Sequence, residues 1–208
     1  MKQRDRETRD RLLKAAAQLF ADRGFKKVTV RDICRAAKAN VASVNYHFGD
    51  KTGLYREIVQ RAIERVRETN DAARAAGAGL PAEERLRKYI SVALCRSTGA
   101  HGSIGWIPRL INRELIDPTP AVDALLEQAF RPRVDDLSEM VAEILQCDRD
   151  DPRVSQSVAS IHVQWMLFVP NPIASRFREK LRLRAEDPVK LADHIARFSL
   201  AGIHALET

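Results

Sequence analysis

The segment from Val28 to Lys51, VTVRDICRAAKANVASVNYHFGDK, constrains the fold more than any other part of the sequence. Thr29 can cap the helix that follows it, and Asp32 stands three residues later, where a capping box places its second partner. Asn40 can cap a second short helix, and Asp50 can cap a third. Two short helices joined by a tight turn form the plan of a helix-turn-helix, whose second helix enters the DNA major groove.

Apolar residues fall on one face of each short helix: Val30, Ile33, Cys34 and Ala37 in the first, and Val41, Val44 and Phe48 in the second. On a helical wheel of about 100° per residue, Val44 and Phe48 point inward and Val41 lies near the edge of that face. The opposite face of the second helix is small or polar and carries Ala42, Ser43, Tyr46 and His47. An ordinary amphipathic helix with a solvated face explains this pattern equally well.

The distribution of charge favours a nucleic-acid partner. Through Arg56 the chain carries 14 Lys and Arg against six Asp and Glu, whereas the remaining residues carry 21 against 22. The whole basic excess of this chain, +7 at pH 7, therefore lies in its first quarter. Basic side chains that neutralise phosphates release counterions and so favour binding to a polyanion.

From about Arg9 to Tyr55 the sequence resembles the DNA-binding domain of the TetR/AcrR family of bacterial regulators. The resemblance is carried by LLKAAAQLFADRGF, by TVRDIC at Thr29–Cys34, by Tyr46-His47-Phe48 and by Lys51. Lys38 stands where the family usually has Gly, and Val44-Asn45 replaces the common Leu-Tyr. The family relation implies an N-terminal three-helix domain that binds double-stranded operator DNA.

The resemblance also implies which residues contact DNA: Arg31, Val41, Ala42 and Ser43 read bases, and Thr29, Tyr46, His47 and Lys51 bind phosphates. Arg31 can donate a fork of N–H groups to guanine, and Ala42 offers an apolar contact to a thymine methyl. Lys51 adds its own charge to the amides of a helix N-terminus. The helical wheel agrees for Ala42, Ser43, Tyr46 and His47, but it places Val41 near the core.

Downstream, IPRLINRELIDPTPAVDALLEQAFRPRVDDL and QWMLFVPNPIASRF are similar to the C-terminal half of the TetR subgroup that includes the regulator CecR. This similarity implies a helical domain that binds an effector and pairs its terminal helices in a homodimer. The bulky apolar residues predicted for the pocket are Trp106, Leu110, Trp165 and Phe168. Aromatic residues at helical spacing are more often core than ligand contacts, so both interpretations stay open. An apolar pocket suits a small lipophilic compound.

The remaining sequence predicts an all-α protein with a helix-turn-helix domain at 1–55 and a helical effector-binding and dimerisation domain at 56–208. Helices are expected at 51–76, 82–98, 104–116, 120–146, 152–168, 172–183 and 188–206, with a kink at Pro132. The three cysteines are widely spaced, and no apolar run is long enough to span a membrane, which together indicate the cytoplasm. No catalytic, metal-binding or cofactor-binding motif is evident, so an enzyme is not expected.

These features predict a ligand-responsive transcriptional regulator, most simply a repressor that a small lipophilic effector releases from a palindromic operator. The alternative is a structural dimer that binds nucleic acid without sequence preference and has no effector.

Overall fold

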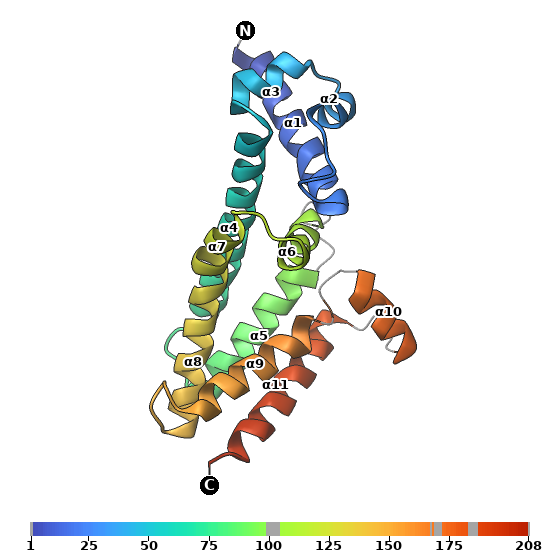
Figure 1. Ribbon diagram of the computed structural model, residues 1–208. Coiled ribbons are helices and arrows are strands. Elements are labelled where there is room, and N and C mark those ends of the chain that lie inside the picture. The colour runs from blue at the N-terminus through green and yellow to red at the C-terminus, as the bar shows by residue number, and fades with distance from the viewer. Residues whose placement is uncertain (1, 99–104, 167, 169–171, 183–186, 208) are drawn as a thin grey trace. The chain divides into compact units, whose positions relative to one another are not determined.

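The computed structural model describes residues 2–98, 105–166, 168, 172–182 and 187–207, and all regular structure in those residues is helical. The prediction of an all-α protein is confirmed. The elements in Figure 1 are α1 (Lys2–Arg23), α2 (Val30–Ala37), α3 (Val41–Phe48), α4 (Lys51–Ala76), α5 (Ala82–Thr98), α6 (Trp106–Ile116), α7 (Val122–Leu125), the π-helix η1 (Leu126–Phe130), α8 (Arg131–Leu145), α9 (Pro152–Met166), α10 (Pro172–Lys180) and α11 (Pro188–His204). No helix in these described ranges is long and apolar enough to cross a membrane.

The segment predicted as one helix at 120–146 is instead three successive elements, α7, η1 and α8. Pro132 has no backbone N–H, so it cannot donate to the carbonyl one turn earlier, and the helix changes its hydrogen bonding there. The sequence predicts a kink at Pro132; the structure has a five-residue π-helix directly before α8, and Pro132 lies in the first turn of α8.

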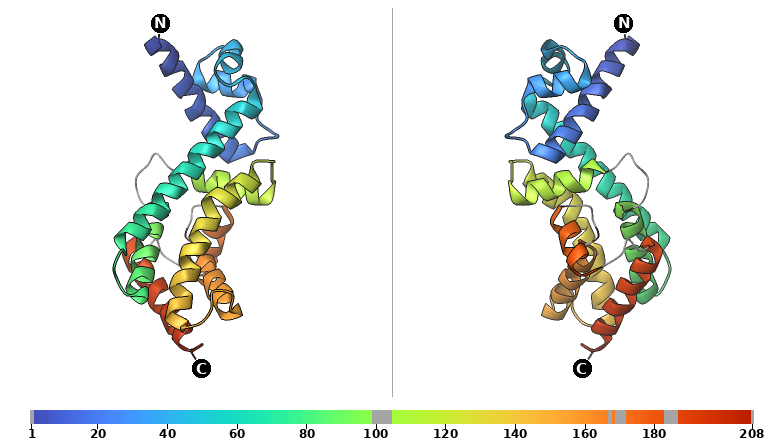
Figure 2. Two further views of the ribbon diagram at one scale, coloured as in Figure 1. Left: turned by 90° about the vertical axis from the view of Figure 1, so that its left-hand side faces the viewer. Right: turned by 90° about the vertical axis from the view of Figure 1, so that its right-hand side faces the viewer.

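The chain divides into two compact units. Unit 1 contains Met1–Glu64 and Ser103–Leu125, and unit 2 contains Arg65–Gly102 and Leu126–Thr208. This division differs from the boundary predicted after residue 55, because α6 packs against α1 (Figure 2). Arg109 of α6 donates to the side chain of Gln18 at 2.7 Å, and Arg113 donates to the carbonyl of Asp22 at 3.2 Å.

The core of unit 1 contains three aromatic rings from different parts of the sequence. The Tyr55 ring lies 4.9 Å from the Phe20 ring and 4.8 Å from the Phe25 ring, measured between centroids. The Tyr55 hydroxyl donates a hydrogen bond to the carboxylate of Glu114 on α6. Glu114 also accepts from the backbone N–H of Thr119 at 3.1 Å, so a buried carboxylate is satisfied from both sides.

Burial, followed by the hydrogen bond and the negative charge of Glu114, raises the pKa of Tyr55. The hydroxyl therefore stays protonated at neutral pH and can act as the donor in this contact.

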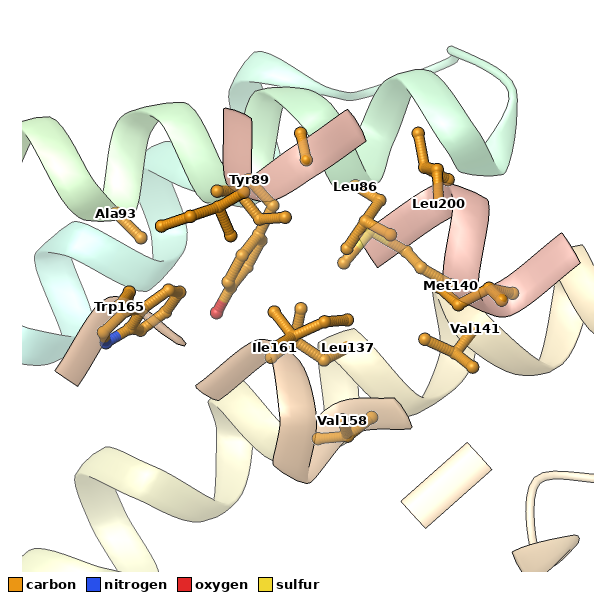
Figure 3. Close-up of a cluster of buried hydrophobic side chains, with 14 of the residues drawn as sticks. Leu86, Tyr89, Ala93, Leu137, Met140, Val141, Val158, Ile161, Trp165 and Leu200 are labelled. Atoms are coloured by element: carbon orange, nitrogen blue, oxygen red, sulfur yellow. The ribbon is translucent and has the colours of Figure 1, made fainter. Parts of the chain in front are cut away.

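Unit 2 has its own hydrophobic core, built from α5, α8, α9 and α11. Its fully buried side chains include Leu86, Ile90, Leu94, Leu137, Val141 and Ile161. Figure 3 shows Tyr89 and Trp165 at one end of this cluster and Met140 at the other. Each fully buried large apolar side chain contributes on the order of 1.5–3 kcal/mol to folding. Unit 2 therefore carries a core that does not depend on the helix-turn-helix.

The contact between Tyr55 and Glu114 predicts a selective loss of stability. Tyr55→Phe removes the hydroxyl and leaves a buried carboxylate with only the donors of Thr119, which should cost about 1.5–3 kcal/mol of unfolding free energy in urea denaturation. Tyr46→Phe is the matched control, because Tyr46 is 75% exposed and the same change at the surface should stay within about 0.5 kcal/mol. Equal effects of the two substitutions would contradict the assigned role of the hydroxyl.

Candidate nucleic-acid interface

Local hydrogen bonds fix the start of each short helix in unit 1. The Thr29 hydroxyl accepts from the backbone N–H of Asp32 at 3.2 Å, and the Asp32 carboxylate accepts from the backbone N–H of Thr29 at 3.1 Å. The Asn40 side chain accepts from Ala42 at 3.1 Å, and Asp50 accepts from Gly53 at 2.7 Å. All three predicted caps are present, so local sequence is sufficient to start α2, α3 and α4.

The turn between α2 and α3 depends on a residue with left-handed backbone geometry. Lys38 has φ 50° and ψ 49°, and its backbone N–H donates to the carbonyl of Arg35 at 3.4 Å. Ala39 donates to the carbonyl of Cys34 at 3.0 Å, which completes the end of α2. The turn thus keeps the conformation that a glycine would favour, although Lys38 carries a side chain.

The outer face of α3 is open to solvent, while its inner face is held in the core. Val44 is fully buried, whereas Ala42 and Tyr46 are exposed. Ser43 is half-buried at the margin between the two faces. Val41, which the helical wheel places at the edge of the apolar face, is 43% exposed, and its position is compatible with base contact.

His47 differs from its expected position on the outer face. Only 8% of its side chain is exposed, and its Nε2 lies 3.4 Å from a carboxylate oxygen of Asp5 on α1. The helical wheel considers α3 alone and therefore misses the neighbouring α1. A phosphate contact by His47 stays a prediction, but it would have to compete with Asp5.

Three other residues predicted to contact DNA differ in whether their polar groups already have partners within the protein. The Thr29 hydroxyl donates to Asp32 at 2.6 Å, so its proton is already used within the cap. The Lys51 ammonium lies 4.2 Å from the centre of the Phe25 ring, and burial lowers the pKa of Lys51. Arg31 is exposed and has no ion-pair partner in the described part of the chain. Arg31 and Lys51 are therefore available to an anion, whereas Thr29 is primarily a structural residue.

The four predicted effector residues are divided between the two units. Trp106 and Leu110 belong to α6 in unit 1, and Leu110 is fully buried there. Trp165 is buried in the core of unit 2, and Phe168 packs against that core. The structure thus does not gather all four in one unit, and their contact with an effector stays a prediction.

A separate groove of about 270 Å³ lies between α9 and α11 and is lined by none of these four residues. Its walls carry polar and apolar side chains from both helices: Gln156, Ser157, Ser160, Ile161, Gln164, Phe198, Ser199, Gly202, Ile203 and Leu206.

The sequence analysis did not predict two buried charged residues, Glu114 and Arg133. Glu114 follows Ile107 and Leu110 at helical spacing, so it continues the buried stripe of α6. Arg133 follows Leu125 and Ala129 in steps of four, along the buried side of η1 and α8. Both could have been predicted, because each continues the apolar stripe of its helix.

Both halves of the chain match families of known regulators. Residues 12–58 match the bacterial regulatory proteins of the tetR family, and residues 82–203 match the C-terminal domain of the HTH-type transcriptional dual regulator CecR. The chain belongs to the TetR family. It is a helix-turn-helix, DNA-binding transcriptional regulator with a CecR-type C-terminal domain.

Individual relatives of this TetR-family regulator agree with that assignment. CecR of Shigella flexneri is 27% identical over 156 residues, which cover 71% of this chain and 69% of that protein. The probable regulator YttP of Bacillus subtilis is 35% identical over 66 residues, so the chain spans only 32% of its length. A tetR-family protein from Rhodococcus RHA1 has a TM-score of 0.70 over 94% of this chain and 96% of its own, and at 16% identity it supports the fold alone.

The left-handed backbone conformation of Lys38 predicts that a glycine at this position stabilises this TetR-family regulator. Lys38→Gly removes the steric cost of a side chain in the left-handed region and should raise the unfolding free energy by about 1 kcal/mol. Ala39→Gly is the control, because Ala39 has no positive φ and the added chain entropy should lower stability. A loss of stability in Lys38→Gly, measured by urea denaturation, would show that the lysine side chain contributes more than the backbone conformation costs.

Proposed function

We propose that this protein is a homodimeric repressor that leaves a palindromic operator when its C-terminal unit binds a small, largely apolar effector. The observation that carries the proposal is the combination of a helix-turn-helix with an exposed outer face and a second unit that has its own core. A DNA reader alone would not need that second core. The protein would act in the cytoplasm, where its DNA target is found.

Within the DNA-binding unit, each predicted contact has a separate role. Arg31, Val41, Ala42 and Ser43 face the bases, and Arg31 supplies the forked donor that suits guanine. Tyr46 and Lys51 contact the phosphates on either side of α3, with Thr29 and His47 as weaker contributors because their polar groups already have partners. This division separates sequence preference from affinity for the backbone.

For dimerisation, α9 and α11 offer the best surface. The side chains of Val163 on α9 and Phe198 on α11 are both 65% exposed. They lie on the two helices that form the groove of about 270 Å³. Exposed apolar side chains beside a groove are typical of a surface that binds a partner. A second copy of the chain, related by a two-fold axis, would cover both helices.

For induction, the aromatic and apolar residues Trp106, Leu110, Trp165 and Phe168 are the proposed effector contacts. α4 contributes residues to both units, with Lys51 near its start and Asn70 in unit 2. An effector that binds one conformation better than another would shift the population that fits the operator. Such a coupling is typically worth about 1–3 kcal/mol.

The alternative function is a structural dimer that binds nucleic acid without sequence preference. DNA selected from a random pool by the purified protein separates the two, because a repressor enriches one palindrome whose half-sites lie about one helical turn apart. Enrichment of no sequence would favour the structural alternative. No enzymatic activity and no cofactor are proposed.

The phosphate assignment predicts how salt affects binding. Lys51→Ala should weaken binding to all DNA sequences alike and reduce the slope of log affinity against log salt by about one unit. Arg31→Ala should instead relax the preference at particular base pairs, by about 1–3 kcal/mol where the contact is bidentate. Lys88→Ala removes the same charge from unit 2, where Lys88 is exposed, and it should leave the slope unchanged. Titrations at several salt concentrations measure all three.

The dimer assignment predicts a monomeric variant. Phe198→Asp places a charge in the proposed interface, and light scattering at micromolar concentration should show monomers that bind the operator weakly. Phe177→Asp on α10 is the control, because Phe177 is also exposed, at 55%, but lies outside α9 and α11. A dimer that survives Phe198→Asp but not Phe177→Asp would assign the interface to α10.

A further inference from the structure

A buried arginine in unit 2 has almost no polar partner. Arg133 on α8 is 7% exposed, and no carboxylate lies within ion-pair distance of it in the described part of the chain. Its Nε donates to the side-chain oxygen of Asn70 at 3.4 Å. A guanidinium has five N–H donors, and no carboxylate or carbonyl oxygen of the described residues accepts from its two terminal amino groups, which have only the Tyr89 hydroxyl as a neighbouring polar group.

Aromatic rings surround this charge. The guanidinium carbon of Arg133 lies 4.7 Å from the centre of the Trp165 ring and 5.7 Å from that of Phe130. The His162 ring is close to both, 5.5 Å from the Trp165 ring and 6.1 Å from the Phe130 ring between centroids. Cation–π contacts of this kind offset part of the desolvation of the charge, but they leave its in-plane N–H donors unused.

A second polar group lies beside the guanidinium. The buried hydroxyl of Tyr89 has no hydrogen bond of good geometry in the described structure, and Arg133 is its nearest hydrogen-bonding neighbour. Burial raises the pKa of Tyr89 to about 12; the positive charge of Arg133 opposes that rise, and the negative charge of Asp136 adds to it. Figure 3 shows Tyr89 and Trp165 at the same end of the core.

Of the four polar side chains Asn70, Tyr89, Arg133 and His162, only Arg133 is charged at pH 7. Burial, and then the charge of Arg133, lowers the pKa of His162 to about 4, so the imidazole is neutral at pH 7. Tyr89 stays protonated at that pH, and Asn70 is neutral. The Arg133 cluster, defined as Asn70, Tyr89, Phe130, Arg133, His162 and Trp165, therefore combines one cation and unused donors with aromatic surfaces.

We propose that the Arg133 cluster binds the carboxylate of the effector, and that this effector is a small organic acid with an aromatic body. A carboxylate accepts two parallel N–H bonds from a guanidinium and has further lone pairs for the Tyr89 hydroxyl. The rings of Trp165, Phe130 and His162 supply stacking surfaces for the body of the ligand. The inference rests on the proposed function, because it gives a chemical class to the proposed effector.

A purely structural role for Arg133 makes a different prediction. If the arginine serves only to hold Trp165 and Phe130, its replacement by methionine should lower stability through lost packing. If it is instead retained for a ligand, Arg133→Met removes an unpaired buried charge, and the ligand-free protein should melt at the same temperature as the wild type or higher.

The test uses the full-length protein and four aromatic acids, benzoate, 2-naphthoate, biphenyl-4-carboxylate and 3-phenylpropanoate, each paired with its neutral amide. At least one acid should bind in calorimetry and raise the melting temperature more than its amide does. Arg133→Met should weaken that binding by about 30-fold or more. Arg131→Met is the control, because Arg131 is two residues away on α8, 66% exposed and paired with Glu127, and it should bind the acid normally.

Three results would overturn the assignment: no acid bound better than its amide, equal loss of binding in both variants, or unchanged binding in Arg133→Met. Release from the selected operator is measured with the same compounds. An acid that binds through Arg133 but leaves the operator complex intact would support the site and refute induction. A neutral compound that releases both the wild type and Arg133→Met from the operator would support induction. It would refute the proposal that the effector binds through a carboxylate.

Discussion

The buried contact between Tyr55 and Glu114 is the constraint on which the arrangement of unit 1 depends. A carboxylate without donors in this interior would cost several kcal/mol, so α6 is stable there only while Tyr55 and Thr119 supply hydrogen bonds. Because Tyr55 also packs against Phe20 and Phe25, the same side chain joins α6 to the core of the helix-turn-helix. A helix from the middle of the chain thereby becomes part of the DNA-binding unit.

The helix α4 contributes functional side chains to both units. It carries Lys51 beside the helix-turn-helix, then Tyr55, and in unit 2 it carries Asn70. Asn70 donates to the carbonyl of Ala129 in the π-helix at 3.2 Å and accepts from Arg133. π-helical turns often lie at functional sites, since they break the regular ladder of backbone bonds. A ligand that changes the hydrogen bonds of Arg133 would act on the helix that also holds Lys51.

Features decided by neighbouring residues could be predicted from the sequence, and features decided by distant residues could not. The caps at Thr29, Asn40 and Asp50 and the extent of α4 depend on local hydrogen bonds and periodicity, and the structure has them. The contact of His47 with Asp5 joins α3 to another helix, which a wheel drawn for α3 alone cannot include. Likewise, Tyr55, one of the two partners of Glu114, lies far away in the sequence, so periodicity shows that Glu114 is buried but not that it meets Tyr55.

The two kinds of cation in this protein serve different physical purposes. Arg31 is exposed and Lys51 is half-buried, so the contribution to DNA binding proposed for them should fall as salt rises. Arg133 lies in an apolar core, where salt screens little and an unpaired charge destabilises the fold. A purely hydrophobic effector would be served equally well by an apolar side chain at this position, with a more stable unit 2. The presence of a buried guanidinium without a carboxylate partner in the described residues is therefore better explained by an anion that completes its hydrogen bonds than by packing alone.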